Sequence, residues 1–270
     1  MLAVDRLVDS TRGWRRRSQF ASVRCYCAFV GYPRSGHSLI GALLNAHPRM
    51  AIAHELDAVG LVTRKGYTRN ALFSAIFDRD EWWKGRQWKW EGWDYTISGQ
   101  AQGVRDDIRV VGDKAGGLTS RQLTQDPATF TRLSDAIGTP MRFIHHIRNP
   151  FDTIATMARK GQPGVSDLDT AISRYFDQHV RGVRIAKSFA GGDLHDLYHE
   201  SMLQQPEATM AALCEHLGQT ASAEYLRACR ERINPSPTQS RHSVTWRKDQ
   251  LDRVKTLASN VEWLSSYTFD

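Results

Sequence analysis

The feature that most constrains this chain is an apolar run that passes directly into a glycine-containing loop and then into a helical segment. Residues 25–31 read C-Y-C-A-F-V-G, and a short run without charged residues is typical of a strand buried on both faces. The loop at 32–38 reads Y-P-R-S-G-H-S, and the apolar residues after it predict a helix over 38–45. This order gathers backbone N–H groups and the positive end of a helix dipole at one point, where a phosphate binds. The segment therefore predicts an anion site at the edge of a sheet.

Strands alternate with helices along the rest of the chain. Further apolar runs predict strands at 108–112, 141–147 and 194–198. Helical patterns predict helices at 118–123, 128–137, 150–159, 167–189, 207–217, 221–231 and 248–263. Such alternation is typical of a parallel sheet covered on both faces. We therefore expect an α/β fold, a P-loop-like three-layer sandwich with a central parallel sheet flanked by helices, as a single domain over residues 1–270.

Composition excludes several classes of protein. A chain of 270 residues with 41% hydrophobic residues can build a core without cross-links, and no apolar run approaches the roughly 20 residues of a membrane-spanning helix. The N-terminus lacks the apolar stretch of a signal peptide, so we expect a soluble cytoplasmic protein. The four cysteines have neither the density of a disulfide scaffold nor the spacing of a zinc site, so we expect reduced packing residues: Cys25, Cys27, Cys214 and Cys229.

The net charge of +7 suits an anionic ligand as well as nucleic acid. The basic residues do not form the long stripe with interleaved aromatic residues that single-strand binders use, so we expect no nucleic-acid partner. Residues 1–22 predict a basic N-terminal helix. Peripheral contact of this helix with a membrane surface is left open.

The loop departs from the nucleotide-binding pattern G-x-x-x-x-G-K-[ST] at one position. His37 stands where the lysine that reaches the terminal phosphates belongs, which disfavours an ordinary ATPase. Arg34 lies within the loop and offers a two-pronged donor to a phosphate or sulfate oxygen. Ile40 occupies the second glycine position of a hydrolase nucleophile elbow, which disfavours a serine hydrolase. A plain strand-to-helix turn made by Ser35 and Gly36 remains the alternative.

Two motifs carry a family resemblance. The loop 32–38 resembles the 5′-phosphosulfate loop of sulfotransferases that use 3′-phosphoadenosine 5′-phosphosulfate (PAPS), in its arginine variant. The segment R-N-P-F-D-T-I-A-T at 148–156 resembles the family's 3′-phosphate motif R-x-P-x-D-x-x-x-S, with Thr156 in place of serine. The chain thus resembles bacterial-type PAPS-dependent sulfotransferases, including carbohydrate and protein-tyrosine sulfotransferases, over most of its length from Cys25 onward.

The resemblance implies a set of residues that bind the co-substrate PAPS and its product 3′,5′-ADP, without a metal. From the loop the set takes Arg34, Ser35, Gly36, His37 and Ser38, and from later segments Arg148, Thr156 and Arg241. For Arg148 an ion pair with Asp152 is the alternative. For Arg241 a solvated loop position is the alternative.

Sulfuryl transfer to a hydroxyl needs a base and cations near the developing charge. The segment N-A-H-P-R-M-A-I-A-H-E at 45–55 resembles a family segment whose glutamate is catalytic, which places that role on Glu55. We expect the strand before Glu55 to run beside the phosphate loop. The alternatives are a helix-start carboxylate at Glu55 and His54 as the base. Lys114 follows the strand at 108–112 and matches a family lysine, so the catalytic set is Glu55, Arg34 and Lys114.

A tryptophan-rich insertion over 80–103 is the candidate acceptor side. It holds six aromatic residues and three nearby cations: Trp82, Trp83, Trp88, Trp90, Trp93 and Tyr95, with Lys84, Arg86 and Lys89. Flat aromatic faces bind sugar rings, so a saccharide or glycolipid acceptor comes first and a protein tyrosine second. Packing of the tryptophans against the sheet is equally compatible with the sequence. A P-loop nucleoside kinase or NTPase that uses Mg²⁺ is the rival class, for which Asp113 would be the metal-binding acid.

Overall fold

The computed structural model describes residues 10–103, 107–160, 164–236 and 238–270. Its central sheet is parallel, with the strand order β2-β5-β1-β6-β7. The strands are β1 (Cys25–Gly31), β2 (Met50–His54), β5 (Val110–Lys114), β6 (Met141–Ile147) and β7 (Leu194–Tyr198). The predicted α/β fold with a central parallel sheet is confirmed.

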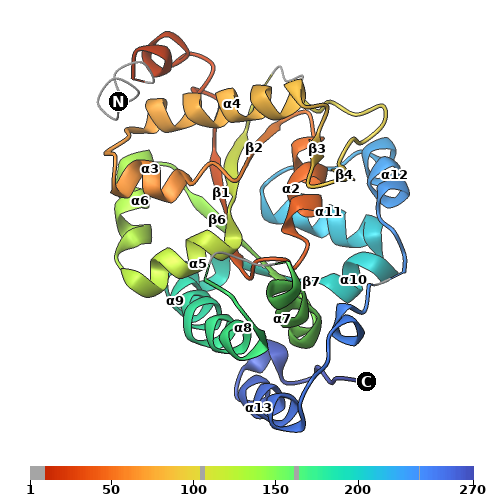
Figure 1. Ribbon diagram of the computed structural model, residues 1–270. Coiled ribbons are helices and arrows are strands. Elements are labelled where there is room, and N and C mark those ends of the chain that lie inside the picture. The colour runs from red at the N-terminus through yellow and green to blue at the C-terminus, as the bar shows by residue number, and fades with distance from the viewer. Residues whose placement is uncertain (1–9, 104–106, 161–163, 237) are drawn as a thin grey trace.

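Strand side chains point alternately to two cores, which produces three layers. In β1, Tyr26 and Val30 belong to one apolar cluster, whereas Cys27 and Phe29 belong to another. Helices cover both faces of the sheet (Figure 1). One face carries α3 (Ala58–Thr63), α4 (Arg69–Gly85), α5 (Gly116–Gln125), α6 (Thr129–Ile137) and α9 (Arg181–Ala190). The other carries α2 (His37–Asn45), α10 (His199–Gln204), α11 (Pro206–His216) and α12 (Ala223–Arg232).

A third cluster forms where the chain continues beyond β6. It joins α7 (Pro150–Arg159), α8 (Leu168–Arg174), the π-helix η1 (Tyr175–Val180) and α13 (Lys248–Ser259). The helix predicted over 167–189 is present as α8, η1 and α9 in succession, so its middle is a π-helix. There Tyr175 stacks on Tyr32 with ring centroids 4.4 Å apart, which ties this cluster to the loop after β1.

Two expectations about strands need correction. The strand predicted at 108–112 lies two residues later, at Val110–Lys114, so Lys114 is its last residue. The strand before Glu55 does not run beside β1, because β5 lies between them. Sequence order alone does not set sheet order, since β5 pairs with both β1 and β2.

The tryptophan-rich segment is more ordered than an insertion would suggest. Its first residues, 80–85, are the end of helix α4, which the sequence pattern did not predict. It continues as a small hairpin of β3 (Lys89–Trp90) and β4 (Trp93–Asp94). Tyr95 follows the hairpin and contacts the buried ring of Trp83 with centroids 6.0 Å apart.

Of the predicted N-terminal helix, residues 1–9 lie outside the described residues, 10–15 are helical, and 16–22 form turns. Whether this helix contacts a membrane is still open, and the single domain stays a prediction. All four cysteines are buried and free. No helix within the described ranges is long and apolar enough to cross a membrane.

Candidate active site

The carboxyl ends of all five parallel strands open into one cavity of about 550 Å³. Five side chains that line it come from the residues at or just after these ends: Arg34, Glu55, Lys114, Arg148 and His199. In open α/β sheets this edge is where ligands bind, because the loops after successive parallel strands meet there. The sheet therefore brings together residues that are far apart in the sequence.

The loop after β1 is shaped for an anion. Gly36, with φ of 107°, is the N-cap of α2, whose first turn has no acidic residue. The first backbone N–H groups of a helix have no partner within it, so α2 presents donors at the loop. The Ser35 hydroxyl is buried and donates to the carbonyl oxygen of Tyr32 at 3.1 Å, so it braces the loop, whereas Ser38 lines the cavity.

The guanidinium group of Arg34 has one nitrogen that is hydrogen-bonded and another that is buried without a partner among the described residues. Its Nη1 donates to Glu91 Oε2 at 2.5 Å. Its Nε is buried and lacks a hydrogen-bond partner in the part of the chain that the structure describes. A buried N–H normally finds an acceptor. The vacant donor fits a ligand oxygen at this position, as a phosphosulfate group would supply.

Glu55 and Lys114 form an ion pair inside the cavity. Lys114 Nζ donates to Glu55 Oε1 at 2.8 Å and to Ser38 Oγ at 3.0 Å. The Lys114 side chain is 2% exposed and that of Glu55 is 53% exposed, so the carboxylate faces the cavity while the amine lies below it. Burial lowers the pKa of Lys114, and the charge of Glu55 opposes that shift. A carboxylate next to a buried cation can take up a proton from a bound hydroxyl.

Asp113 holds the segment that carries Glu55. Its two carboxylate oxygens accept the N–H groups of Leu56 at 3.0 Å and Ala58 at 2.9 Å. Burial raises its pKa to about 6, although these hydrogen bonds oppose the shift. Glu55 itself has a left-handed backbone, with φ of 52°. Asp113 is therefore a positioning residue, and it is absent from the cavity lining.

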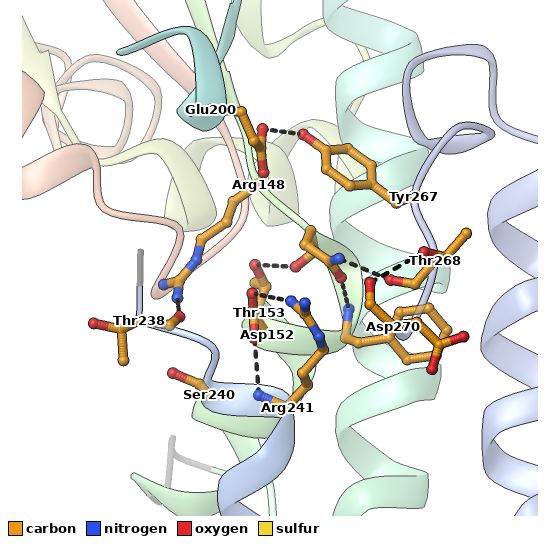
Figure 2. A network of polar contacts seen from close by, with 12 residues as sticks. Arg148, Asp152, Thr153, Glu200, Thr238, Ser240, Arg241, Tyr267, Thr268 and Asp270 are labelled. Atoms are coloured by element: carbon orange, nitrogen blue, oxygen red, sulfur yellow. Dashed lines mark hydrogen bonds and ion pairs between the residues drawn. The ribbon is translucent and has the colours of Figure 1, made fainter. Parts of the chain in front are cut away.

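The second predicted motif lies where β6 passes into α7, and Figure 2 shows its contacts. Asn149 caps α7 by accepting the N–H of Phe151 at 2.9 Å, and Pro150 begins the helix. Arg148 donates to the carbonyl oxygen of Thr238 and, at 3.5 Å, to that of Arg34. Arg148 lines the cavity and thus connects the phosphate loop with the loop that holds Thr238.

Thr156 and Arg241, two further predicted nucleotide-binding residues, differ in position. Thr156 lines the cavity, and its hydroxyl donates to the Asp152 carbonyl oxygen at 2.8 Å. Arg241 is absent from the lining, because its backbone N–H and its Nη1 bind the Asp152 carboxylate at 2.8 and 2.9 Å (Figure 2). The Asp152 pair that the sequence left open for Arg148 is therefore made by Arg241, which secures the loop before α13 to α7.

The histidines near the cavity are neutral. His37 lines it, and burial lowers its pKa to about 3. An added Cβ on Gly116 would lie 2.9 Å from His37 Nε2, so a glycine is needed there to make room for the ring. His54, the alternative base, lies outside the lining, stacked on Trp83 with ring centroids 4.3 Å apart. His54 is fully buried, which keeps it from contact with a substrate and lowers its pKa to about 2.

The aromatic residues of the tryptophan-rich segment divide into two groups. Trp83 and Trp88 are buried and pack with Ala42 in a cluster of their own. Trp90, Trp93 and Tyr95 line the cavity, so the segment contributes both to the packed interior and to the cavity wall. Arg86 stacks on the ring of Trp82 outside the cavity, and none of the three cations predicted to favour an anionic acceptor is in the lining: Lys84, Arg86 and Lys89.

Sequence reasoning missed several residues of the lining. Arg159 is the last residue of α7, Lys160 is its C-cap, and Arg232 is the last residue of α12. A signal existed for the first two, since Arg159 follows Thr156 by nearly one helical turn. Arg232 and Glu91 lie on elements whose placement no local pattern indicates.

Solved structures with a similar fold are sulfotransferases. A comparison with curated protein sequences finds no match. A sulfotransferase from Alicyclobacillus acidocaldarius is similar in structure, with a TM-score of 0.52 and 14% identity over 91% of this chain and 97% of that one. A sulfotransferase from Mycobacterium tuberculosis has a TM-score of 0.52 and 11% identity over 97% of this chain and 83% of that one. At these identities the two structures show the fold alone.

The sequence comparison with known families reaches further than the fold. The profile of the sulfotransferase family matches residues 28–223, a span that holds the phosphate loop, Glu55, Lys114 and the second motif. Because that match covers most of the chain, the chain belongs to the sulfotransferase family.

Proposed function

We propose that this sulfotransferase moves the sulfuryl group of PAPS to a hydroxyl group of an acceptor. The observation that carries the proposal is the convergence of Arg34, the Glu55–Lys114 pair and Arg148 on one cavity. Arg34 and Lys114 line the cavity together with the loop and the start of α2, which present backbone donors. The carboxylate of Glu55 is paired with Lys114. This is the arrangement that transfer of an anionic group needs.

Each end of the donor has residues to hold it. The backbone of 35–38 and the side chains of Arg34 and Ser38 suit the 5′-phosphosulfate, with the neutral His37 as a further donor. Arg148 and Thr156 suit the 3′-phosphate, because a guanidinium and a hydroxyl both donate to phosphate oxygens. When bound, PAPS supplies an SO₃ group attached to a phosphate leaving group.

Glu55 acts as the general base in this proposal. The acceptor oxygen forms a bond to sulfur while the bond between sulfur and the phosphate oxygen breaks, and 3′,5′-ADP leaves. The proton of the acceptor hydroxyl passes to the Glu55 carboxylate, which the structure places 2.8 Å from Lys114 Nζ. Lys114 and Arg34 stabilise the charge that develops on the leaving oxygen.

The acceptor would bind against the aromatic side of the cavity. Trp90, Trp93 and Tyr95 offer flat faces there, which suits a saccharide or the sugar of a glycolipid. A protein tyrosine is the second acceptor to test, because an aromatic ring also stacks on such faces. Arg232 also lines the cavity and interacts electrostatically with Tyr95, so a positive charge borders the same side.

The decisive experiment measures binding and transfer together. Calorimetry should show tighter binding of 3′,5′-ADP than of 5′-AMP or ATP, without a need for Mg²⁺. Labelled sulfate from PAPS should then appear on one member of a panel of saccharides, glycolipids and tyrosine peptides. Preference for ATP with dependence on Mg²⁺ would contradict the proposal and favour the kinase or NTPase reading.

A further inference from the structure

Arg34 and Lys114, the two cations assigned to the reacting group in the proposed function, are both paired with carboxylates, but the two pairs differ. Lys114 is 2% exposed and pairs with Glu55, which follows the adjacent strand β2. Arg34 is 26% exposed and pairs with Glu91, which is itself 44% exposed. Glu91 lies 57 residues from Arg34, on the β3–β4 hairpin. The first pair belongs to the sheet, whereas the second joins the phosphate loop to a surface hairpin.

Glu91 lies in the turn of the β3–β4 hairpin, which has few backbone hydrogen bonds of its own. Glu91 and Gly92 connect β3 and β4 with φ of 48° and 81°, and a two-residue turn with positive φ at both positions is favoured in hairpins. A non-glycine residue in this region costs about 1 kcal/mol. Each strand has two residues, and a two-stranded hairpin is marginally stable by itself. The position of the hairpin therefore depends on its contacts with the rest of the chain.

Those contacts include the Arg34 pair and one aromatic cluster. Trp90 meets His54 and Trp82 with ring centroids 5.0 and 6.0 Å apart, whereas Trp93 is 60% exposed. An ion pair between partly exposed groups contributes roughly 0.2–1 kcal/mol. A ligand that offers Arg34 a better acceptor can therefore separate it from Glu91.

Arg34 is arranged to accept such a ligand. Its Nη1 is bound by Glu91, while its Nε is buried without a partner among the described residues. An arginine binds an oxyanion best through two parallel N–H groups, which a tetrahedral phosphate or sulfate reaches as readily as a carboxylate does. A ligand on the Nε edge and Glu91 on Nη1 then share one guanidinium, and because their like charges repel each other, each weakens the binding of the other.

We propose that Glu91 is an internal competitor for the donor's anionic group at Arg34, so that donor binding releases the hairpin and adjusts the acceptor side. Trp90 and Trp93 flank Glu91 in the chain and line the same cavity, so they move with it. Only the identity of the donor in this inference, PAPS, rests on the proposed function. The competition itself applies to any ligand with two linked tetrahedral anions.

Binding constants test the competition. We would measure the affinity for PAPS and for inorganic pyrophosphate by calorimetry in the wild type, Glu91→Gln and Glu81→Gln, which removes an exposed carboxylate outside the cavity lining. Glu91→Gln should tighten both ligands about 3- to 10-fold, and Glu81→Gln should leave both unchanged. In an Arg34→Ala background the effect of Glu91→Gln should fall below about twofold. Unchanged or weaker binding of pyrophosphate by Glu91→Gln would overturn the proposal.

Tryptophan fluorescence tests the release of the hairpin. Adding pyrophosphate to the wild type should increase acrylamide quenching. Trp90→Phe should remove most of that increase, because Trp90 is the half-buried ring that packs the hairpin against His54 and Trp82. Glu91→Gln should show the higher quenching before any ligand is added, and equal quenching in both proteins would count against release. Glu91→Gln could bind pyrophosphate more tightly while the wild type shows no preference for PAPS over ATP. That result would support the competition and reject only PAPS as the donor.

Discussion

The two halves of the cavity are built in different ways. On the donor side, the phosphate loop and the start of α7 follow adjacent buried strands, and caps, hydrogen bonds and burial fix them. On the acceptor side, two tryptophans stand on a hairpin of two residues per strand. Backbone strain occurs on both sides, since Arg34, Glu55 and Glu91 all have positive φ. Such strain concentrates at functional sites, where surrounding structure must hold it.

This difference leads us to expect that the proposed donor site is preformed, whereas the proposed acceptor side is adjustable. Residues in a buried scaffold keep their positions when a ligand arrives, because any shift would disturb close packing. Residues on a small exposed hairpin shift at little cost. We expect changes on the donor side to alter chemistry and nucleotide binding strongly, and changes on the hairpin to alter stability little.

The largest expected effect is at Glu55. Glu55→Gln keeps an acceptor oxygen for Lys114 but removes the base, so single-turnover transfer of labelled sulfate should slow about 10²- to 10⁴-fold. Binding of 3′,5′-ADP should stay within a few-fold of the wild type. His54→Ala is the comparison variant, because His54 lies outside the cavity lining. Near-normal transfer by Glu55→Gln together with an inactive His54→Ala would reverse the assignment of the base.

Arg148→Ala should remove most of the preference for 3′,5′-ADP over 5′-AMP. Loss of a charge-assisted hydrogen bond to the 3′-phosphate predicts a drop of about 10- to 100-fold in that ratio, measured by calorimetry. Arg253→Ala changes an exposed arginine on α13 that binds Ser173, and should leave the ratio unchanged. A full preference in Arg148→Ala would mean that other residues bind the 3′-phosphate.

His54 should make the fold sensitive to acid. Its pKa is ordinarily near 6.5 and falls to about 2 in the folded chain, because burial penalises the charged ring. The unfolded chain therefore binds one more proton between these values, so the stability present above pH 6.5 is lost as the pH falls, by about 1.4 kcal/mol per pH unit. His54→Phe removes this one proton, so the free energy of unfolding should fall less steeply with pH, by about 1.4 kcal/mol per pH unit.

Urea unfolding at pH 7, 6 and 5 measures that slope. His242→Phe changes an exposed ring and serves as the control. If His54→Phe and the wild type lose stability in parallel as the pH falls, then His54 is protonated in the folded chain and its neutral burial is refuted.

The smallest effect is expected at Trp93. Its side chain is 60% exposed, so Trp93→Ala should change the free energy of unfolding by no more than about 0.5 kcal/mol. Trp83→Ala empties a site that is 1% exposed and should cost about 3–5 kcal/mol. Urea unfolding of both variants compares the two groups of tryptophans directly. Similar losses would show that the hairpin is part of the core.

The sequence by itself determined the local elements of this protein. The strand 25–31 and the helix 150–159 could be read correctly because apolar runs, glycine and proline act on their immediate neighbours. The loop after the strand is two residues shorter than predicted, because α2 begins at His37. The family, too, followed from short motifs within such elements. Helix α4 was missed because its apolar residues do not gather on one clear face.

Only the tertiary structure decided which strands and side chains from distant parts of the chain lie next to each other. The place of β5 between β1 and β2, the pairing of Arg241 with Asp152 and the division of the tryptophans all depend on contacts between distant segments. The contact between Glu91 and Arg34 is of the same kind, since 57 residues separate them. A local pattern records what a residue needs from its neighbours in the chain, whereas sheet order and packing are fixed by the energy of the whole fold.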